Sequence, residues 1–339
     1  MPTIKEIAEL AGVSRGTVDR VLNKRGGVNP TTEEKVLEIA KALNYKPNLA
    51  GTILAAQKKR LLLGVVLLGV GTPFYDDVLS GVRQKAAELE SYNCTVVVKH
   101  TEYDAIAQLQ AIQELVAEGV NGIAITPYND NRIRKEIHRL FSLGIPVVTL
   151  NTDIENTERL AYVGCNFYHS GETAAGLMHL ITSGQVFVGI ISGSRDVLCH
   201  TQRIAGFSDT IQKKYPNIRV SAAITNQDDD FESYEQTRRL LDSHPEINAL
   251  YFTAGGVYGG CKAVIASGRH YDIRIITNDA VATTREMIEQ GVIAATICQE
   301  PEVQGSKPLD LLFNYLTTGE LPKEEFNYVD AEIKILENI

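Results

Sequence analysis

The feature that most restricts the fold is a regular alternation of short apolar runs with amphipathic stretches after residue 60. The runs predict strands at 62–69, 94–98, 122–126, 146–150, 160–164, 186–192, 219–224, 248–253, 273–277 and 294–298. The amphipathic stretches predict helices at 75–91, 105–118, 130–143, 170–183, 203–214, 233–243, 257–267, 281–290 and 302–318. Such alternation is typical of parallel sheets covered by helices on both faces. Ten strands over this length indicate two sheets, and therefore an α/β body of two lobes.

The uneven charge divides the chain in the same way. Residues 1–60 carry a net charge of +5, whereas the remainder carries −14. A basic head on an acidic body indicates that the head alone meets a polyanion. We therefore expect a headpiece at 1–46, a hinge and linker at 47–60, and a body at 61–339. Within the body we expect an N-lobe at about 61–164 plus 300–326 and a C-lobe at about 165–299 plus 327–339.

Composition and motifs exclude several classes of protein. No apolar stretch approaches the roughly 18 residues that cross a membrane, and the first residues lack the apolar run of a secretion signal. We therefore expect a cytoplasmic protein without a membrane partner. The five cysteines lie far apart with no CxxC pair, which favours reduced thiols over a metal site or a disulfide framework. HExxH, GxSxG and P-loop motifs are absent, so we expect no enzyme, no metal and no cofactor.

The first 46 residues predict three short helices with the spacing of a helix-turn-helix. Gly12 supplies the turn after the first helix, and Ser14 is expected to cap the second by accepting from the amide of Thr17. The stretch "TTEEKVLEIAKAL" predicts the third helix, with a capping box between Thr31 and Glu34. A second helix of this kind enters the major groove with its first turns on the base edges.

The charged side chains of the second helix suit that role. Arg15 and Arg20 can bind guanine or phosphate, and Asp19 can accept from a cytosine amino group. The simpler alternative is a three-helix module with a solvated charged face.

The headpiece resembles the lactose repressor family in its "TIKEIA" start, its "AGVS" turn, its "TVDRVLN" helix and its "NYKPN" exit. The resemblance implies double-stranded operator DNA as a partner, and a homodimer that reads a symmetric operator. It places Arg15, Gly16, Asp19 and Arg20 at the bases, and Ser14, Thr17 and Asn23 nearer the backbone. Two positions depart from the family. The position of Asp19 more often carries serine, and Gly16 has no side chain at a position that otherwise contacts the bases.

The hinge of this family inserts a leucine into the minor groove, and Leu54 matches that leucine by its spacing from "KPN". Gly51 and Thr52 depart from the usual hinge sequence. Because glycine costs roughly 1 kcal/mol in a helix relative to alanine, we expect a looser hinge helix. The alternative is that Leu54 packs at a dimer contact.

The body resembles the type I periplasmic sugar-binding proteins and the effector domains of the same repressor family. The resemblance rests on "TPFY", "RIAGF", "TND" and "CQEP", which follow predicted strands. It implies two doubly wound parallel sheets with a small carbohydrate-like effector between them. The implied pocket residues are Thr72, Phe74, Tyr75, Asn151, Arg203, Phe231, Asn278, Asp279 and Gln299. Aromatic faces and hydrogen-bonding side chains suit a polyhydroxylated ligand. The alternatives are core packing for the aromatics and a lobe-bridging ion pair between Arg203 and Asp279.

The loop "FTAGGVYGG" departs from that pattern, because Ala254 and Gly255 stand where sugar binders often carry an Asn-Asp pair. Bare amides at Gly255 and Gly256, at a helix N-terminus, would suit a carboxylate or phosphate. The sequence therefore predicts an effector-controlled DNA-binding regulator, more often a repressor in this family. An anionic sugar derivative or another metabolite is the alternative effector, and a sugar-modifying enzyme is the more distant alternative function.

Overall fold

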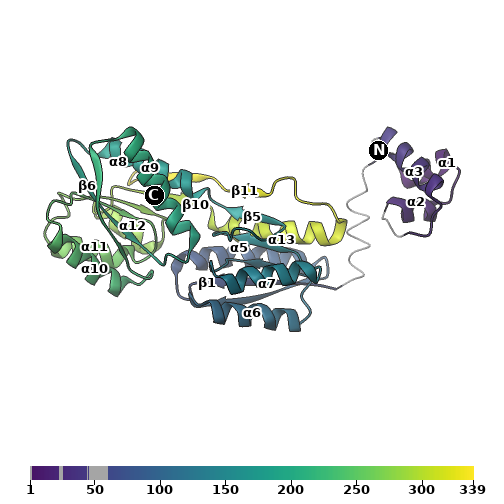
Figure 1. Ribbon diagram of the computed structural model, residues 1–339, viewed down its shortest axis with the longest axis horizontal. Coiled ribbons are helices and arrows are strands. Elements are labelled where there is room, and N and C mark those ends of the chain that lie inside the picture. Colours follow the sequence, from purple (N-terminus) through teal and green to yellow (C-terminus); the bar gives the residue numbers. More distant parts are fainter. Residues whose placement is uncertain (1, 23–25, 44, 46–59) are drawn as a thin grey trace. The chain divides into compact units, whose positions relative to one another are not determined.

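The computed structural model describes residues 2–22, 26–43, 45 and 60–339 (Figure 1). The chain divides into two compact units, Met1–Ala56 and Gln57–Ile339. Asn23, Leu54 and the predicted hinge as far as residue 59 lie outside the described residues.

The first unit contains the three predicted helices, α1 (Ile4–Ala11), α2 (Arg15–Leu22) and α3 (Pro30–Ala42). Their inner faces meet in one small core centred on Ile7, Val18 and Val36, which are all fully buried. Helix α1 ends at Gly12, whose φ of 70° is in the left-handed region that glycine favours. This turn sets α2 against α1 and α3, as the helix-turn-helix pattern predicts.

The start of α3 differs from the sequence prediction. Asn29 is the N-cap, and its Oδ1 accepts from the amide of Thr31 at 3.0 Å. The predicted capping box between Thr31 and Glu34 is therefore wrong. Pro30 explains the earlier start, because its fixed φ suits the first position of a helix and its missing amide is not needed there.

The second unit contains two six-stranded sheets (Figure 1). The N-lobe sheet has the order β11-β5-β4-β3-β1-β2 and the C-lobe sheet the order β12-β10-β9-β8-β6-β7. The N-lobe strands are β1 (Leu61–Leu68), β2 (Cys94–Thr101), β3 (Gly122–Ile125), β4 (Val147–Leu150), β5 (Ala161–Gly164) and β11 (Phe326–Tyr328). The C-lobe strands are β6 (Val186–Ser192), β7 (Ile218–Thr225), β8 (Ala249–Phe252), β9 (Arg274–Asn278), β10 (Ala295–Gln299) and β12 (Ala331–Lys334). Only β12 is antiparallel to its neighbour among these pairs.

Helices connect and cover the strands. In the N-lobe they are α5 (Pro73–Glu90), α6 (Ala105–Ala117), α7 (Asn131–Ser142) and α13 (Pro301–Thr318). In the C-lobe they are α8 (Phe167–Ile181), α9 (Leu198–Lys214), α10 (Asp230–Ser243), α11 (Val257–Ala266) and α12 (Ala282–Glu289). Each strand and helix predicted in the body is present, although α9 begins five residues before its predicted start. No helix in the described part of the chain is long and apolar enough to span a membrane.

The chain passes between the lobes after β5, after β10 and after β11. Strand β11, which the sequence did not predict, pairs in parallel with β5 from Phe326 to Tyr328. The N-lobe sheet therefore continues to residue 328, two residues beyond the predicted boundary at 326.

Close backbone contacts fix the helices that begin at the carboxyl ends of β1 and β6. A Cβ atom at Gly305 of α13 would lie 2.0 Å from the carbonyl oxygen of Val78 on α5. In the other lobe, a Cβ at Gly206 of α9 would lie 2.0 Å from the carbonyl oxygen of Tyr168 on α8. Both contacts require glycine, and they hold α5 and α9 in equivalent positions at the cleft between the lobes.

Candidate functional site

The first candidate site is the outer face of α2. The Oγ of Ser14 accepts from the amide of Thr17 at 3.1 Å, as predicted, and so caps the helix. Val18 and Val21 face the core. Arg15, Gly16 and Arg20 are exposed, and Ser14, Thr17 and Asp19 lie exposed or half-buried beside them. The structure thus places the predicted base-facing residues together on the free side of this helix.

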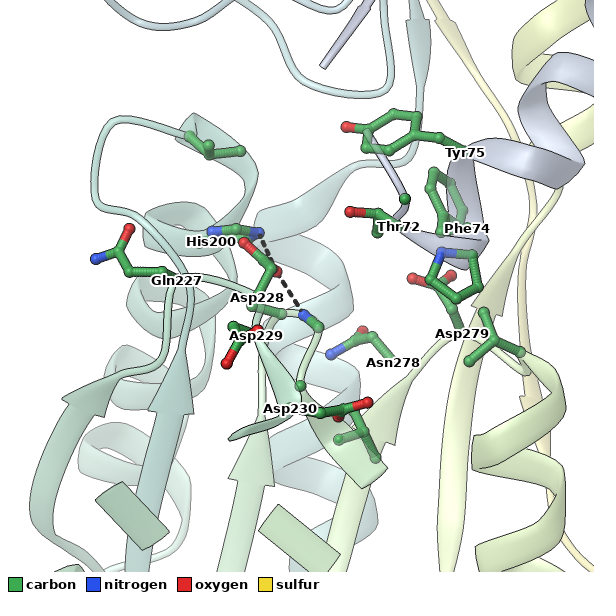
Figure 2. A pocket seen from close by; sticks show the side chains of 18 of the residues that line it. Thr72, Phe74, Tyr75, His200, Gln227, Asp228, Asp229, Asp230, Asn278 and Asp279 are labelled. Carbon is green, nitrogen blue, oxygen red and sulfur yellow. Dashed lines mark hydrogen bonds and ion pairs between the residues drawn. The ribbon is translucent and has the colours of Figure 1, made fainter. Parts of the chain in front are cut away.

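The second candidate site is a cleft of about 480 Å³ between the two lobes of the body. Figure 2 shows Thr72, Phe74 and Tyr75 of the N-lobe on one side, with a group of C-lobe side chains opposite them. Nine predicted residues line the cleft: Thr72, Phe74, Tyr75, Asn151, Arg203, Gly255, Asn278, Asp279 and Gln299. They come from loops and helix starts at the carboxyl ends of the parallel strands, where doubly wound sheets bind ligands.

The aromatic pair lies in the first turn of α5. The rings of Phe74 and Tyr75 meet edge to face, with centroids 5.4 Å apart. Tyr75 is 4% exposed, and its hydroxyl donates to Oδ1 of Asn151 at 3.2 Å. Phe74 is only half-buried. Phe74 can therefore present its ring to a ligand, while Tyr75 supports it from behind.

Arg203 and Asp279 retain free hydrogen-bonding capacity in the cleft. Nη1 of Arg203 donates to the carbonyl oxygen of Thr253 at 2.8 Å, but its buried Nε has no hydrogen-bond partner. Asp279 accepts from Gln299 through Oδ2, and its buried Oδ1 has no partner. Burial raises the pKa of the Asp279 carboxyl, and the charge of Arg203 opposes that rise. The two side chains do not form the predicted alternative of a lobe-bridging ion pair, since both belong to the C-lobe and no ion pair joins them.

Asn151 and Asp279 occupy equivalent places in the two lobes, directly after β4 and β9. Both have a left-handed backbone, with φ of 62° and 66°. Asparagine and aspartate tolerate this conformation better than other residues with a Cβ. In each lobe, this left-handed residue turns the backbone from the end of the strand toward the cleft. Asn278 instead bonds within the C-lobe, since its Nδ2 donates to the carbonyl oxygen of Phe252 at 2.8 Å.

Gly255 lines the cleft, but its amide is not bare. It donates to Oδ1 of Asp228 at 2.6 Å, shown by a dashed line in Figure 2. The amide of Gly259, in the first turn of α11, donates to Oδ1 of Asp230 at 3.0 Å. Carboxylates of the protein therefore already occupy this helix N-terminus. The predicted bare amide at Gly255 is therefore wrong, because the carboxylate of Asp228, 27 positions earlier in the sequence, accepts from it.

Phe231 is also placed differently from its prediction. Its side chain is 78% exposed and does not line the cleft. The preceding residue, Asp230, turns its carboxylate toward α11 and the cleft. Because successive residues of a helix point about 100° apart, Phe231 on α10 faces solvent.

Several cleft residues were not predicted from the sequence, namely Glu102, Tyr103, His200, Asp228, Asp229 and Asp230. The run "DDD" after β7 was the available signal for the carboxylates. His200 lies on α9 one turn before Arg203, and its Nε2 is 4.0 Å from Oδ1 of Asp228. Burial by itself would lower the pKa of His200, but its interactions with Cys199 and Asp228 outweigh burial and raise it to about 9. Among the described residues, no cluster of histidine, cysteine and carboxylate side chains has the geometry of a metal site.

Two protein families match the chain. Residues 63–321 match the periplasmic binding protein domain, and residues 3–48 match the bacterial regulatory proteins of the lacI family. The ribose operon repressor of Halalkalibacterium halodurans is 29% identical over 292 residues, which cover 83% of this chain and 81% of the relative. The probable HTH-type transcriptional repressor ExuR of Bacillus subtilis is 26% identical, with 91% and 96% covered.

Solved structures share the fold of the body. GanP, a glucose-galactose binding protein from Geobacillus stearothermophilus, has a TM-score of 0.77 and 24% identity, covering 83% of this chain and 99% of its own. A putative LacI transcriptional regulator from Bacteroides fragilis has a TM-score of 0.74 and 20% identity, covering 83% of this chain and 98% of its own. At such identities the likeness shows the fold, with two lobes around a cleft.

The raised pKa of His200 predicts a pH dependence of stability. A histidine whose pKa rises from 6.5 in the unfolded chain to about 9 on folding stabilises the protein below pH 6.5. That contribution is lost as the pH rises through about 9. Urea unfolding should therefore show wild type losing stability from pH 6.5 to 9.5 more steeply than His200→Gln. An NMR titration that placed the His200 midpoint below 6.5 would contradict this assignment.

Proposed function

The chain belongs to the periplasmic binding protein domain family through its body and to the lacI family of bacterial regulatory proteins through its headpiece, and we propose from this that its effector is a neutral, polyhydroxylated sugar. As a family member it is a DNA-binding transcriptional regulator whose body binds an effector. The finer proposal concerns which residues bind the operator and the effector, and how the two sites are coupled.

The observation that supports the effector proposal is that the cleft combines hydrogen-bonding groups without a partner with the face of an aromatic ring. Nε of Arg203 and Oδ1 of Asp279 are buried without partners, and Phe74 presents a half-buried ring. A sugar hydroxyl donates and accepts at once, so it satisfies a guanidinium and a carboxylate together. The apolar face of a sugar ring packs on an aromatic ring.

The charge of the cleft supports a neutral ligand over an anionic one. Its lining includes the carboxylates Glu102, Asp228, Asp229, Asp230 and Asp279, against the cations Arg203 and His200. A sugar acid or sugar phosphate would add negative charge beside these carboxylates, and like charges in a partly buried site repel one another. The protein carboxylates also use the helix N-terminus that such an anion would need.

We propose that the outer face of α2 reads the operator, through Arg15, Gly16, Asp19 and Arg20, with Ser14 and Thr17 nearer the DNA backbone. A symmetric operator requires two headpieces, so the proposed assembly is a homodimer acting on the chromosome in the cytoplasm. The name "ribose operon repressor" for one relative supports repression as the outcome. The named relatives are regulators, and we propose no catalytic activity for the cleft.

A thermal-shift panel tests the effector proposal. It contains D-ribose, D-xylose, D-galactose and myo-inositol, with D-gluconate, D-glucuronate and D-ribose 5-phosphate as the anionic arm. A neutral member at 100 times its Kd should add about 2.7 kcal/mol to the free energy of unfolding. Asp279→Ala should abolish the shift, whereas the exposed Glu289→Gln should retain it. Stabilisation by the anionic members alone would overturn the neutral-sugar proposal.

Gly16 offers a test of the DNA-reading face that leaves the headpiece intact. A Cβ atom there would meet only Oγ of Ser14, at the ordinary contact distance of 3.7 Å. Gly16→Gln should therefore keep the helical circular dichroism spectrum. Selection from a random duplex library should return a site that differs from the wild-type site at one position in each half. If the two selected sites are identical, Gly16 does not face the bases.

A further inference from the structure

One chain of four hydrogen bonds runs from the N-lobe to the C-lobe, and its central member does not line the cleft. Tyr75 Oη donates to Asn151 Oδ1 at 3.2 Å, and Asn151 Nδ2 donates to Gln304 Oε1 at 3.1 Å. Gln304 Nε2 donates to Gln299 Oε1 at 3.0 Å, and Gln299 Nε2 donates to Asp279 Oδ2 at 3.3 Å. Tyr75, Asn151, Gln299 and Asp279 line the cleft, whereas Gln304 is fully buried behind it.

The direction of these hydrogen bonds is fixed at the Asp279 end, because the hydroxyl of Tyr75 can either donate or accept. An ionised carboxylate only accepts, so Gln299 must turn its Nε2 toward Asp279 and its Oε1 toward Gln304. Gln304 must then donate to Gln299, which leaves its own oxygen for Asn151. The oxygen of Asn151 in turn faces the hydroxyl of Tyr75. Each amide orientation therefore depends on the next, from the carboxylate in one lobe to the phenol in the other.

Gln304 connects the C-lobe part of the hydrogen-bond chain to its N-lobe part, close to the point where the polypeptide passes between the lobes. It lies on α13 of the N-lobe, while Gln299 ends β10 of the C-lobe. A buried amide that turned over would leave polar groups without partners, which destabilises the folded protein. We propose that Gln304 is a positioning residue, which orients the cleft side chains of both lobes by carrying this hydrogen-bond chain. The proposal rests on the effector site described above, but its test needs no effector.

Reversal of the chain provides the test. In Gln304→Glu the new carboxylate can accept from Asn151 but cannot donate to Gln299. Gln299 must turn over, and its oxygen then faces the carboxylate of Asp279. Adding Asp279→Asn supplies an amide donor at that end, so that all the bonds re-form with the opposite direction from Gln304 to residue 279.

Gln108 is the matched control. It is also fully buried, and both ends of its amide are bonded to backbone groups of Thr126 and Tyr128. Gln108→Glu should therefore destabilise the protein in a comparable way, but its partners are not connected to Asp279 by any bond of this chain.

The full-length variants are compared by the midpoint of thermal unfolding at pH 8 without ligand. Gln304→Glu should lower the midpoint, and Asp279→Asn should recover more than half of that loss. The same second change should recover nothing in Gln108→Glu. The proposal is overturned if Asp279→Asn fails to rescue Gln304→Glu, or rescues both glutamate variants equally. A failed sugar panel would leave either result intact, so the two proposals fail separately.

A titration gives a second readout that a purely structural role would not move. The hydrogen bond from Gln299 holds down the pKa of Asp279, against the larger upward effect of burial. Gln304→Met frees Gln299 to turn, so the NMR titration midpoint of the Asp279 carboxyl should rise. Gln108→Met should leave that midpoint where it is. An unchanged Asp279 midpoint in Gln304→Met would contradict the positioning role.

Discussion

In each lobe the direction of winding reverses at one strand, which is β1 in the N-lobe and β6 in the C-lobe. At such a reversal the loops at the carboxyl ends diverge and leave a crevice. Helices α5 and α9 begin at these two points, and glycine contacts with α13 and α8 hold them close to their neighbours. The cleft is therefore lined by Phe74 and Tyr75 from the N-lobe and by His200 and Arg203 from the C-lobe.

The distribution of charge separates the two functions of the chain. The basic excess lies within the first 60 residues, where the family binds DNA, whereas the charged side chains that line the cleft are mainly carboxylates. Under the proposed function, DNA and a neutral sugar would therefore bind to different parts of the protein. In the proposed mechanism, the coupling between these two sites depends on the arrangement of the lobes. A ligand that favours one arrangement changes operator affinity, and the operator changes ligand affinity by the same factor.

Most of the fold could be predicted from the sequence, because strand and helix periodicities in the body are long and regular. Some pocket residues that directly follow a strand were predicted, such as Asn151 and Asp279, although Glu102, directly after β2, was missed. The prediction of pocket residues failed where contacts between residues far apart in the sequence decide which groups face the cleft. The bond from Gly255 to Asp228 joins residues 27 positions apart, and no local pattern signals it. Phe231 was misplaced because the pitch of α10 directs Asp230 inward instead. Gln304 has no motif of its own, since its role depends on Asn151 and Gln299, which belong to two other segments.

Effector binding in the cleft is proposed to control binding of the headpiece to DNA. The most direct measurement is the Kd of the full-length protein for its selected duplex, determined by fluorescence anisotropy with and without the stabilising neutral sugar. A coupling free energy of the usual size would change this Kd by about 5- to 150-fold. The same factor should appear in the Kd for the sugar when DNA is present. Identical DNA affinity at saturating sugar would contradict the account, because the cleft and the headpiece would then be independent sites.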